Sequence, residues 1–329
     1  MIETLLQYLL FLAQTVTLAA AIVFVVAAVV NLSRRARESD GMKVSSLNAR
    51  LRRAADGVRN AVLPNAERKK LAKQRRREEK AAREQRRQCV FVIDFRGDIR
   101  ASATASLREE VSAVLAVATE GDEVLVRLEN AGGLVHEHGL AASQLARIQA
   151  RGIPLTVAVD KVAASGGYLM ACVADRIIAA PFAIVGSIGV LAQIPNFRRL
   201  LEERGVTVEQ VKAGRHKRTV SMFGEVSEKD REKLREELED IHELFQAMVH
   251  KHRPQLDLER VATGEHWYGT RALDLGLIDE LGTSDDWLAG KVDEAELLKV
   301  EWRTQKRLMD KLSSAMEEGR LGGLWRRGW

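Results

Sequence analysis

Cysteine is scarce in this chain, which excludes one common way of stabilising a fold. The 329 residues include two cysteines, Cys89 and Cys172. Two cysteines are too few for a disulfide framework, and their spacing matches no metal-binding motif. We therefore expect both to be small, buried, apolar side chains.

Histidine is also sparse, and its distribution argues against a metal site. The seven histidines include two close pairs, His136 with His138 and His250 with His252. Residues two positions apart share a face only on a strand, and no cysteine or third histidine stands at ligand spacing. We therefore expect no metal and no cofactor. None of the histidines stands out as a catalytic base.

Charge is missing altogether from the segment between Thr4 and Ser33, where Leu, Ile, Val, Phe and Ala dominate. About 20 residues span a bilayer at ~1.5 Å per residue, so this segment is long enough to cross one. A cleaved signal peptide would need a positive start and a shorter apolar core, but the only early charge is Glu3. The sequence therefore predicts a retained transmembrane helix over residues 1–33.

A basic segment follows the predicted anchor. Residues 34–88 hold 19 Lys and Arg against 7 Asp and Glu, whereas the rest of the chain is acidic in balance. The composition predicts helix with a break near Pro64. No aromatic residue interleaves for base stacking, so we expect anionic lipid head groups as the partner and no nucleic acid. The positive-inside rule predicts a cytoplasmic body behind this flank.

The remainder has the pattern of an α/β domain, which we expect over residues 89–290. Apolar strands are predicted at 89–95, 124–129, 155–160 and 175–181, and helical stretches separate them. This alternation favours βαβ units and a mainly parallel sheet. A capped amphipathic helix is predicted from Ser227 to Arg253. We expect residues 291–329, which include three tryptophans, to form a basic amphipathic extension.

A serine in a glycine-rich turn carries the clearest chemical signal. Ser165 follows a buried strand, precedes the pair Gly166-Gly167, and stands before a helical run. A nucleophile in such a turn has a free amide beside it that can stabilise an oxyanion. Gly132-Gly133 ends another strand and could supply a second amide donor. Most Ser-Gly-Gly turns are plain helix caps, so this motif alone does not establish catalysis.

Four motifs together resemble one known family. They are AASGGY (163–168), VGSIGV (185–190), AGRHKR (213–218) and GEHWYGTRALDLGLIDELG (264–282). In this order and spacing they resemble the signal peptide peptidase A (SppA) family over residues 90–288. The resemblance implies a Clp/crotonase-like ββα superhelix, a homo-oligomer, and a membrane-bound serine endopeptidase that needs no cofactor.

The resemblance also implies roles for individual residues. Ser165 matches the nucleophile, and Lys217 matches the lysine that serves as general base. Ser187 matches the serine that orients the lysine, and the amides of Gly133 and Gly166 match the oxyanion hole. Periodicity alone could not choose this lysine from its basic neighbours, which are Lys212, Arg215 and Arg218.

One departure from the family pattern concerns the turn that contains Gly133. The family commonly has Ser-Pro-Gly-Gly there, whereas this chain has Asn130-Ala131-Gly132-Gly133. Both glycines remain, so the amide donors are retained, but the loss of proline is expected to loosen the turn.

The resemblance implies an inner-membrane endopeptidase of bacteria. It also implies signal-peptide remnants or membrane-protein fragments as substrates. Family relatives often act outside the cytoplasm, so a periplasmic catalytic domain is the alternative to the cytoplasmic placement. Two other functions remain open: an inactive membrane scaffold of the same fold, and an acyl-CoA enzyme with a carboxylate base.

Overall fold

The computed structural model describes residues 10–24, 41–82, 87–214, 217 and 219–303. The chain divides into two units, one of residues 1–43 with 302–329 and one of residues 44–301. In the first unit residues 10–24 are helical, and the other residues of the predicted anchor, 1–9 and 25–33, lie outside the described ranges. Among described residues, no helix combines the length and apolarity needed to cross a membrane.

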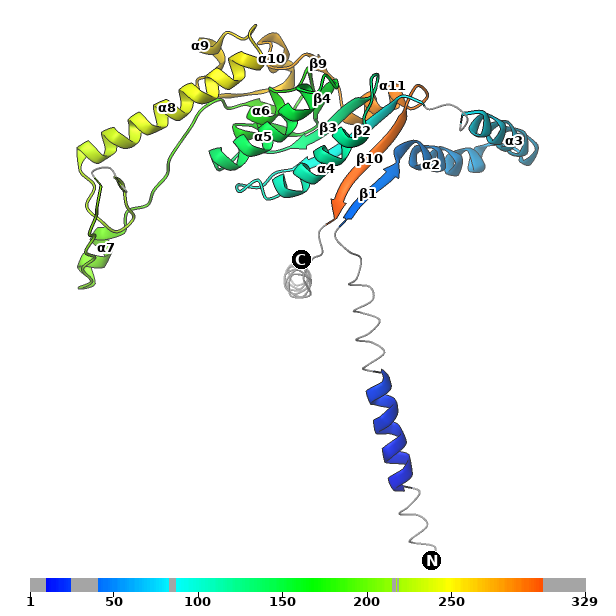
Figure 1. The fold of residues 1–329 in the computed structure, drawn as a ribbon, viewed down its shortest axis with the longest axis horizontal. Helices are drawn as coiled ribbons and strands as arrows, with labels where there is room; N and C mark the ends of the chain where they lie inside the picture. Colours follow the sequence, from blue (N-terminus) through cyan, green and yellow to red (C-terminus); the bar gives the residue numbers. More distant parts are fainter. Residues whose placement is uncertain (1–9, 25–40, 83–86, 215–216, 218, 304–329) are drawn as a thin grey trace, which may run out of the picture. The chain divides into compact units, whose positions relative to one another are not determined.

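The larger unit is built on a seven-stranded sheet with the order β1-β10-β2-β3-β4-β6-β9 (Figure 1). All pairings from β10 to β9 are parallel, which confirms the predicted α/β fold with a mainly parallel sheet. The strands are β1 (Gly41–Ser46), β2 (Cys89–Arg96), β3 (Glu123–Glu129), β4 (Leu155–Val159), β6 (Arg176–Ala179), β9 (Glu280–Leu281) and β10 (Glu296–Arg303).

Both faces of the central strands are buried, which explains why β2, β3, β4 and β6 are continuous apolar runs. In β2, Val90 and Val92 pack with Leu288 of α11 (Ser284–Lys291). Phe91 and Ile93 alternate with them and face the other layer. Further helices between the strands include α4 (Thr104–Val117), α5 (Val135–Gln149), α6 (Gly166–Ala171), α9 (Leu258–Val261) and α10 (Gly269–Asp274).

A second, smaller sheet carries the serine turn. It consists of β5 (Val162–Ala164), β7 (Ile184–Gly186) and β8 (His266–Tyr268). β5 and β7 are parallel, whereas β7 and β8 are antiparallel. Each strand has three residues, too short for a period-2 pattern to reveal, so the sequence did not predict them.

The sheet extends beyond the boundaries expected for the α/β domain. β10 lies beside β2, past the boundary predicted at residue 290, and β1 lies within the segment predicted as basic and helical. The buried Asn48 side chain ties these ends together: it donates to Val292 and Ala295 carbonyls and accepts from the Leu297 amide. Residues 304–329 of the predicted extension lie outside the described ranges.

Helices in the basic segment agree with the prediction. They are α2 (Leu47–Val62) and α3 (Asn65–Ala82), and the break between them falls at Leu63-Pro64. Leu47 and Asn48 are the buried residues of α2, so this helix is anchored to the larger unit at its first turn.

The longest helix is α8 (Glu228–His252), which begins with the predicted capping box of Ser227 and Asp230. Its buried residues, Phe245 and Val249, lie in the C-terminal half. Residues 191–226, which we call the arm, precede it and contain the short helix α7 (Arg198–Glu203). The arm reaches the N-terminal end of α8, away from α6 (Figure 1).

An ion pair between a buried arginine and a partly exposed aspartate fastens α8 to the sheet. Arg253, at the end of α8, is 3% exposed and binds both carboxylate oxygens of Asp279, at 2.6 and 2.9 Å. Asp279 Oδ2 also accepts from the Ile177 amide of β6 at 2.7 Å. Removing Asp279 would leave the buried Arg253 guanidinium without its counter-ion.

We expect Asp279→Ala to lower the free energy of unfolding by about 3–5 kcal/mol, because it leaves the buried Arg253 guanidinium without its counter-ion. Urea unfolding followed by circular dichroism measures this change. The control is Glu228→Ala, which removes an exposed pair with Arg231 and should cost no more than about 1 kcal/mol. Equal effects of the two substitutions would contradict the assignment of α8 docking to the Arg253–Asp279 pair.

Candidate active site

Ser165 lies in the turn between β5 and α6, as the sequence predicts. Its backbone has φ +52° and ψ −120°, a conformation that L-residues rarely adopt. Its amide N–H donates to the Gly186 carbonyl at 2.8 Å, and its carbonyl accepts from Leu169 of α6 at 3.0 Å. The side chain is half-buried. Backbone bonds on both sides therefore hold the serine in a strained position that leaves its hydroxyl accessible.

The turn after β3 meets Ser165 directly. Asn130 forms a parallel bridge with Ala163: its N–H donates to Val162 at 2.9 Å, and its carbonyl accepts from Ala164 at 3.0 Å. A Cβ on Gly132 would lie 2.7 Å from the Cβ of Ser165. Only glycine fits this approach, and Gly132 has φ +93°. The predicted convergence of two strand ends on one serine is thus present.

The two predicted oxyanion donors are the next residues along the chain from that contact, since Gly133 follows Gly132 and Gly166 follows Ser165. Gly133 is exposed and Gly166 is buried at the first position of α6. In the described part of the chain, no hydrogen bond occupies the amide N–H of either glycine. Two unpaired amides beside one serine hydroxyl could receive the oxygen of a tetrahedral intermediate.

Ser187 lies next to Ser165 because their strands are in register. Ala164 of β5 is paired with Gly186 of β7, so the serine that follows each strand emerges at the same sheet edge. Ser187 also has φ +52°, and its hydroxyl donates to the Gly264 carbonyl at 3.3 Å. The structure therefore brings Ser165, Ser187, Gly133 and Gly166 into one place.

Lys217 is not part of this group within one chain. It is exposed, and it lies in the arm, which reaches the far end of α8 from α6 (Figure 1). Its amide donates to the Gly214 carbonyl at 3.2 Å. The single chain thus presents a serine turn without the lysine that the family resemblance assigns to it.

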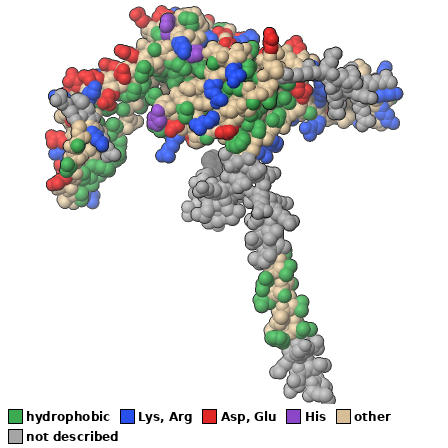
Figure 2. Space-filling model, viewed as in Figure 1, with side chains coloured by type: hydrophobic (Ala, Val, Ile, Leu, Met, Phe, Trp, Pro, Cys, Tyr) green, Lys and Arg blue, Asp and Glu red, His purple; other side chains and the backbone are tan. Residues whose placement is uncertain are grey.

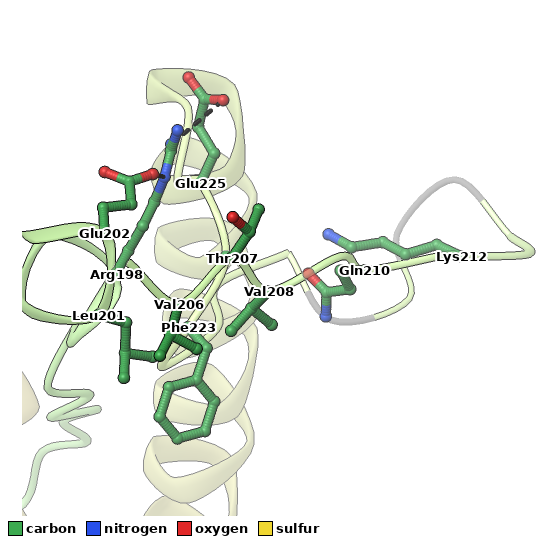
Figure 3. Close-up of a pocket in the computed structure, with 11 residues that line it drawn as sticks. Arg198, Leu201, Glu202, Val206, Thr207, Val208, Gln210, Lys212, Phe223 and Glu225 are labelled. Atoms are coloured by element: carbon green, nitrogen blue, oxygen red, sulfur yellow. Dashed lines mark hydrogen bonds and ion pairs between the residues drawn. The ribbon is translucent and has the colours of Figure 1, made fainter. Parts of the chain in front are cut away.

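The arm has a pocket of its own, and its chemistry is different. Figure 3 shows this pocket, which has a volume of about 330 Å³ and includes Lys212 and Phe223 in its wall. Arg198 there forms ion pairs with Glu202 at 2.8 Å and Glu225 at 3.2 Å. None of the predicted site residues lines this pocket, whose described lining includes the Thr207 hydroxyl and the Lys212 amine.

Two reactive side chains, one on α6 and one at its C-terminal end, face the core instead of the turn. Tyr168 is fully buried, and its hydroxyl donates to the Leu277 carbonyl at 2.9 Å. Burial raises the pKa of the Cys172 thiol to about 12 and also raises the pKa of the Tyr168 phenol. Both groups stay neutral near pH 7 and serve packing.

The sequence did not reveal one neighbour of the turn, His138. His138 of α5 is fully buried and touches both Asn130 and the backbone of Gly166. It was considered as half of a metal pair with His136, but the structure leaves His136 exposed. A contact between residue 138 and residue 166 has no periodic signature along the chain, so no pattern could have revealed it.

Solved structures with a related arrangement are distant. The 1510-N membrane protease specific for a stomatin homolog from Pyrococcus horikoshii is 16% identical, with a TM-score of 0.37 over 70% of this chain and 98% of that one. The ClpP protease catalytic domain from Plasmodium falciparum is 10% identical, with a TM-score of 0.38 over 59% and 85%.

Sequence relatives are much closer. "Probable protease SohB" of Haemophilus influenzae is 54% identical over 72% of this chain and 67% of the relative. The protein of that name from Buchnera aphidicola subsp. Schizaphis graminum is 40% identical over 95% and 94%. A "Putative signal peptide peptidase SppA" of Enterococcus faecium is 32% identical over 53% and 51%.

Family profiles cover nearly the whole chain. Residues 3–145 match the description "Peptidase family S49 N-terminal", and residues 147–298 match "Peptidase family S49". Both matches agree with the four motifs that resemble the signal peptide peptidase A family. The chain belongs to peptidase family S49.

Proposed function

We propose that this peptidase is a membrane-anchored serine endopeptidase with a Ser165–Lys217 dyad. The observation that carries the proposal is the close approach of Gly132 to Ser165. It supports the proposal because the serine backbone is strained and because Gly133 and Gly166, the next residues along the chain, have amides that could bind an oxyanion. The proposed fold is the Clp/crotonase-like superhelix that the family resemblance implies. No cofactor takes part in the proposed reaction.

The proposed reaction is acyl transfer in two halves. Neutral Lys217 takes the proton of the Ser165 hydroxyl as Oγ attacks the peptide carbonyl carbon. The Gly133 and Gly166 amides stabilise the oxyanion, an effect worth about 3–4 kcal/mol for each donor in well-studied hydrolases. The C–N bond then breaks, and the lysinium protonates the leaving amine. Lys217 next activates water, which releases the acyl group from Ser165.

Ser187 has a supporting role in this proposal. It emerges beside Ser165 from the neighbouring parallel strand, and its hydroxyl has an acceptor at 3.3 Å. A hydroxyl held in this way can also accept a hydrogen bond from a lysine amine and direct it toward Ser165. This agrees with the role that the resemblance assigns to Ser187.

We infer that a second copy of the chain supplies Lys217. Within one chain the arm extends away from the serine turn, so the site is incomplete (Figure 1). The arm also carries apolar side chains that one chain leaves uncovered, among them Val211 at 96% and Leu191 at 81% exposure. Figure 2 shows such side chains gathered on the arm. Burying them against another copy would favour the homo-oligomer.

Lipid is the second proposed partner. The uncharged segment 4–33 would anchor the chain, and the basic residues of segment 34–88 follow close behind it in sequence. Positive charge of this kind is attracted to anionic lipid head groups. We propose an inner-membrane location with a cytoplasmic catalytic domain, following the positive-inside rule.

Proposed substrates are extended apolar segments, such as signal-peptide remnants and fragments of membrane proteins. They agree with the name of the Enterococcus faecium relative, "Putative signal peptide peptidase SppA". The alternative is an inactive scaffold of the same fold, and the remote Lys217 is the observation that favours it. An acyl-CoA enzyme would not require Ser165.

Substitution tests the dyad directly. We expect Ser165→Ala and Lys217→Ala each to lower kcat/KM by at least about 1,000-fold, since nucleophile and base act as a unit. The assay uses casein and short apolar peptides in detergent, and a fluorophosphonate probe should label native Ser165. Lys212→Ala, in the same arm, is the control and should change kcat/KM less than about twofold. Retained cleavage in both dyad variants would refute the dyad, and an unlabelled native chain would favour the scaffold.

Mixed assemblies test whether the lysine comes from another copy. Chains with Ser165→Ala and chains with Lys217→Ala are co-expressed with different tags, and assemblies that carry both tags are isolated. Random mixing should restore about a quarter of native activity, because one of four neighbouring pairs joins an intact serine to an intact lysine. A dyad within one chain would leave such assemblies inactive, as would a chain without peptidase activity.

A reporter fused after residue 90 tests the membrane orientation. We expect a reporter that folds only in the cytoplasm to be active, because 19 basic residues against 7 acidic ones precede the fusion point. A matched fusion to a reporter that is active only outside the cytoplasm is the control. Activity of the outside reporter alone would overturn the cytoplasmic placement and support a periplasmic catalytic domain.

A further inference from the structure

Asn130 holds the turn that approaches Ser165. Its side-chain Oδ1 accepts from the Gly132 amide at 2.8 Å, and its Nδ2 lies 3.4 Å from the sulfur of Met170. These partners define the orientation of the amide group, with oxygen toward the turn. Because Asn130 is 1% exposed and its backbone is bridged to β5, it links the turn rigidly to the serine strand.

His138 lies behind both halves of the proposed oxyanion hole. Its Nε2 is 3.2 Å from Oδ1 of Asn130, and its Nδ1 is 2.9 Å from the Leu134 carbonyl. A Cβ on Gly166 would lie 2.4 Å from Cγ of this ring, so the ring packs directly against the Gly166 backbone. One buried side chain thus contacts Asn130 on one side and Gly166 on the other.

Asn130 and His138 lie at the turn where this sequence departs from the family pattern. The family turn has a proline, which restricts φ through its ring. This chain has Ala131, which imposes no such restriction, but the Asn130 side chain closes the turn by bonding the amide two residues on. The hydrogen bond from the Gly132 amide to Asn130 Oδ1 therefore offsets the loosening expected from the loss of proline. His138 contacts the Oδ1 atom that accepts this bond.

We propose that Asn130 and His138 are a positioning pair that directs the Gly133 and Gly166 amides toward the oxyanion, in place of the family proline. The inference rests on the proposed function, since those amides have a chemical role only if Ser165 is acylated. An oxyanion hole acts through the direction of its donors in the transition state. Loss of the pair should therefore lower kcat and leave substrate binding nearly unchanged.

Single substitutions measure this effect. We expect Asn130→Ala and His138→Gln each to lower kcat about 10–100-fold, with KM changed less than about twofold, and to slow fluorophosphonate labelling of Ser165 by a similar factor. The control is His136→Ala, an exposed neighbour on the same helix, which should leave kcat unchanged. Native kcat in both positioning variants would overturn the proposal.

Restoring the family turn distinguishes positioning from general stability. The double variant Asn130→Ser with Ala131→Pro should recover kcat to within about threefold of native, because proline then restricts the turn. In that double variant, His138→Gln should lower kcat clearly less than it does in the native turn. A double variant as slow as Asn130→Ala would contradict the proposal that Asn130 and His138 act in place of the proline. An equal loss of kcat from His138→Gln in both turns would contradict it as well.

Hydrogen exchange gives a readout that needs no activity. Asn130→Ala should speed exchange of the amides at 131–134, while exchange in β2 stays at the native rate. Unchanged exchange at 131–134 would refute the claim that the Asn130 side chain holds this turn. Absence of cleavage and probe labelling in the native chain would instead refute the proposed function, so the two failures can be told apart.

Discussion

The register between three short backbone segments is the constraint on which the rest of the site depends. The end of β3 is bridged to β5 at Asn130 and Ala163, and β5 is paired with β7 from Val162 to Ala164. The residues that follow these segments must then emerge together. This is how Gly132, Ser165 and Ser187 become neighbours although more than 50 residues separate the first from the last.

Strain at Ser165 is a consequence of that register. A non-glycine residue at positive φ costs of the order of 1–3 kcal/mol and persists only where its surroundings impose it. Here the Gly186 carbonyl and the Leu169 amide hold the serine backbone, and Gly132 occupies the space in which another side chain would clash. A buried sheet with helices on both faces supplies the stability that such a turn requires.

The arm differs from the rest of the larger unit in the side chains that it exposes. It exposes apolar side chains and contains Lys217, whereas the core around β2, β3 and β4 is fully covered. In the proposed mechanism a rigid body presents the nucleophile and amides, and an arm from another copy delivers the base. Activity would then depend on assembly, since an isolated chain would hold its lysine far from its own serine.

Patterns with a clear period were predicted well. The apolar runs of β2, β3, β4 and β6 and the capped helix α8 appear where the sequence places them, because burial on two faces and helix capping leave local signatures. The three-residue strands β5, β7 and β8 were not predicted, and β10 was assigned to an extension. These strands form by pairing with segments that lie far away in the sequence. Residues 304–329 of the predicted extension are outside the described ranges.

The sequence by itself determined the α/β class, the serine turn at Ser165 with its glycines, and, through four motifs, the peptidase family. Those features are local, because each depends on residue types at short spacing. Only the tertiary structure decided that Gly132 contacts Ser165, that Asn130 and His138 support the turn, and that Lys217 lies away from it within one chain. Contacts across long separations depend on how sheets and helices pack, and no local pattern records that packing.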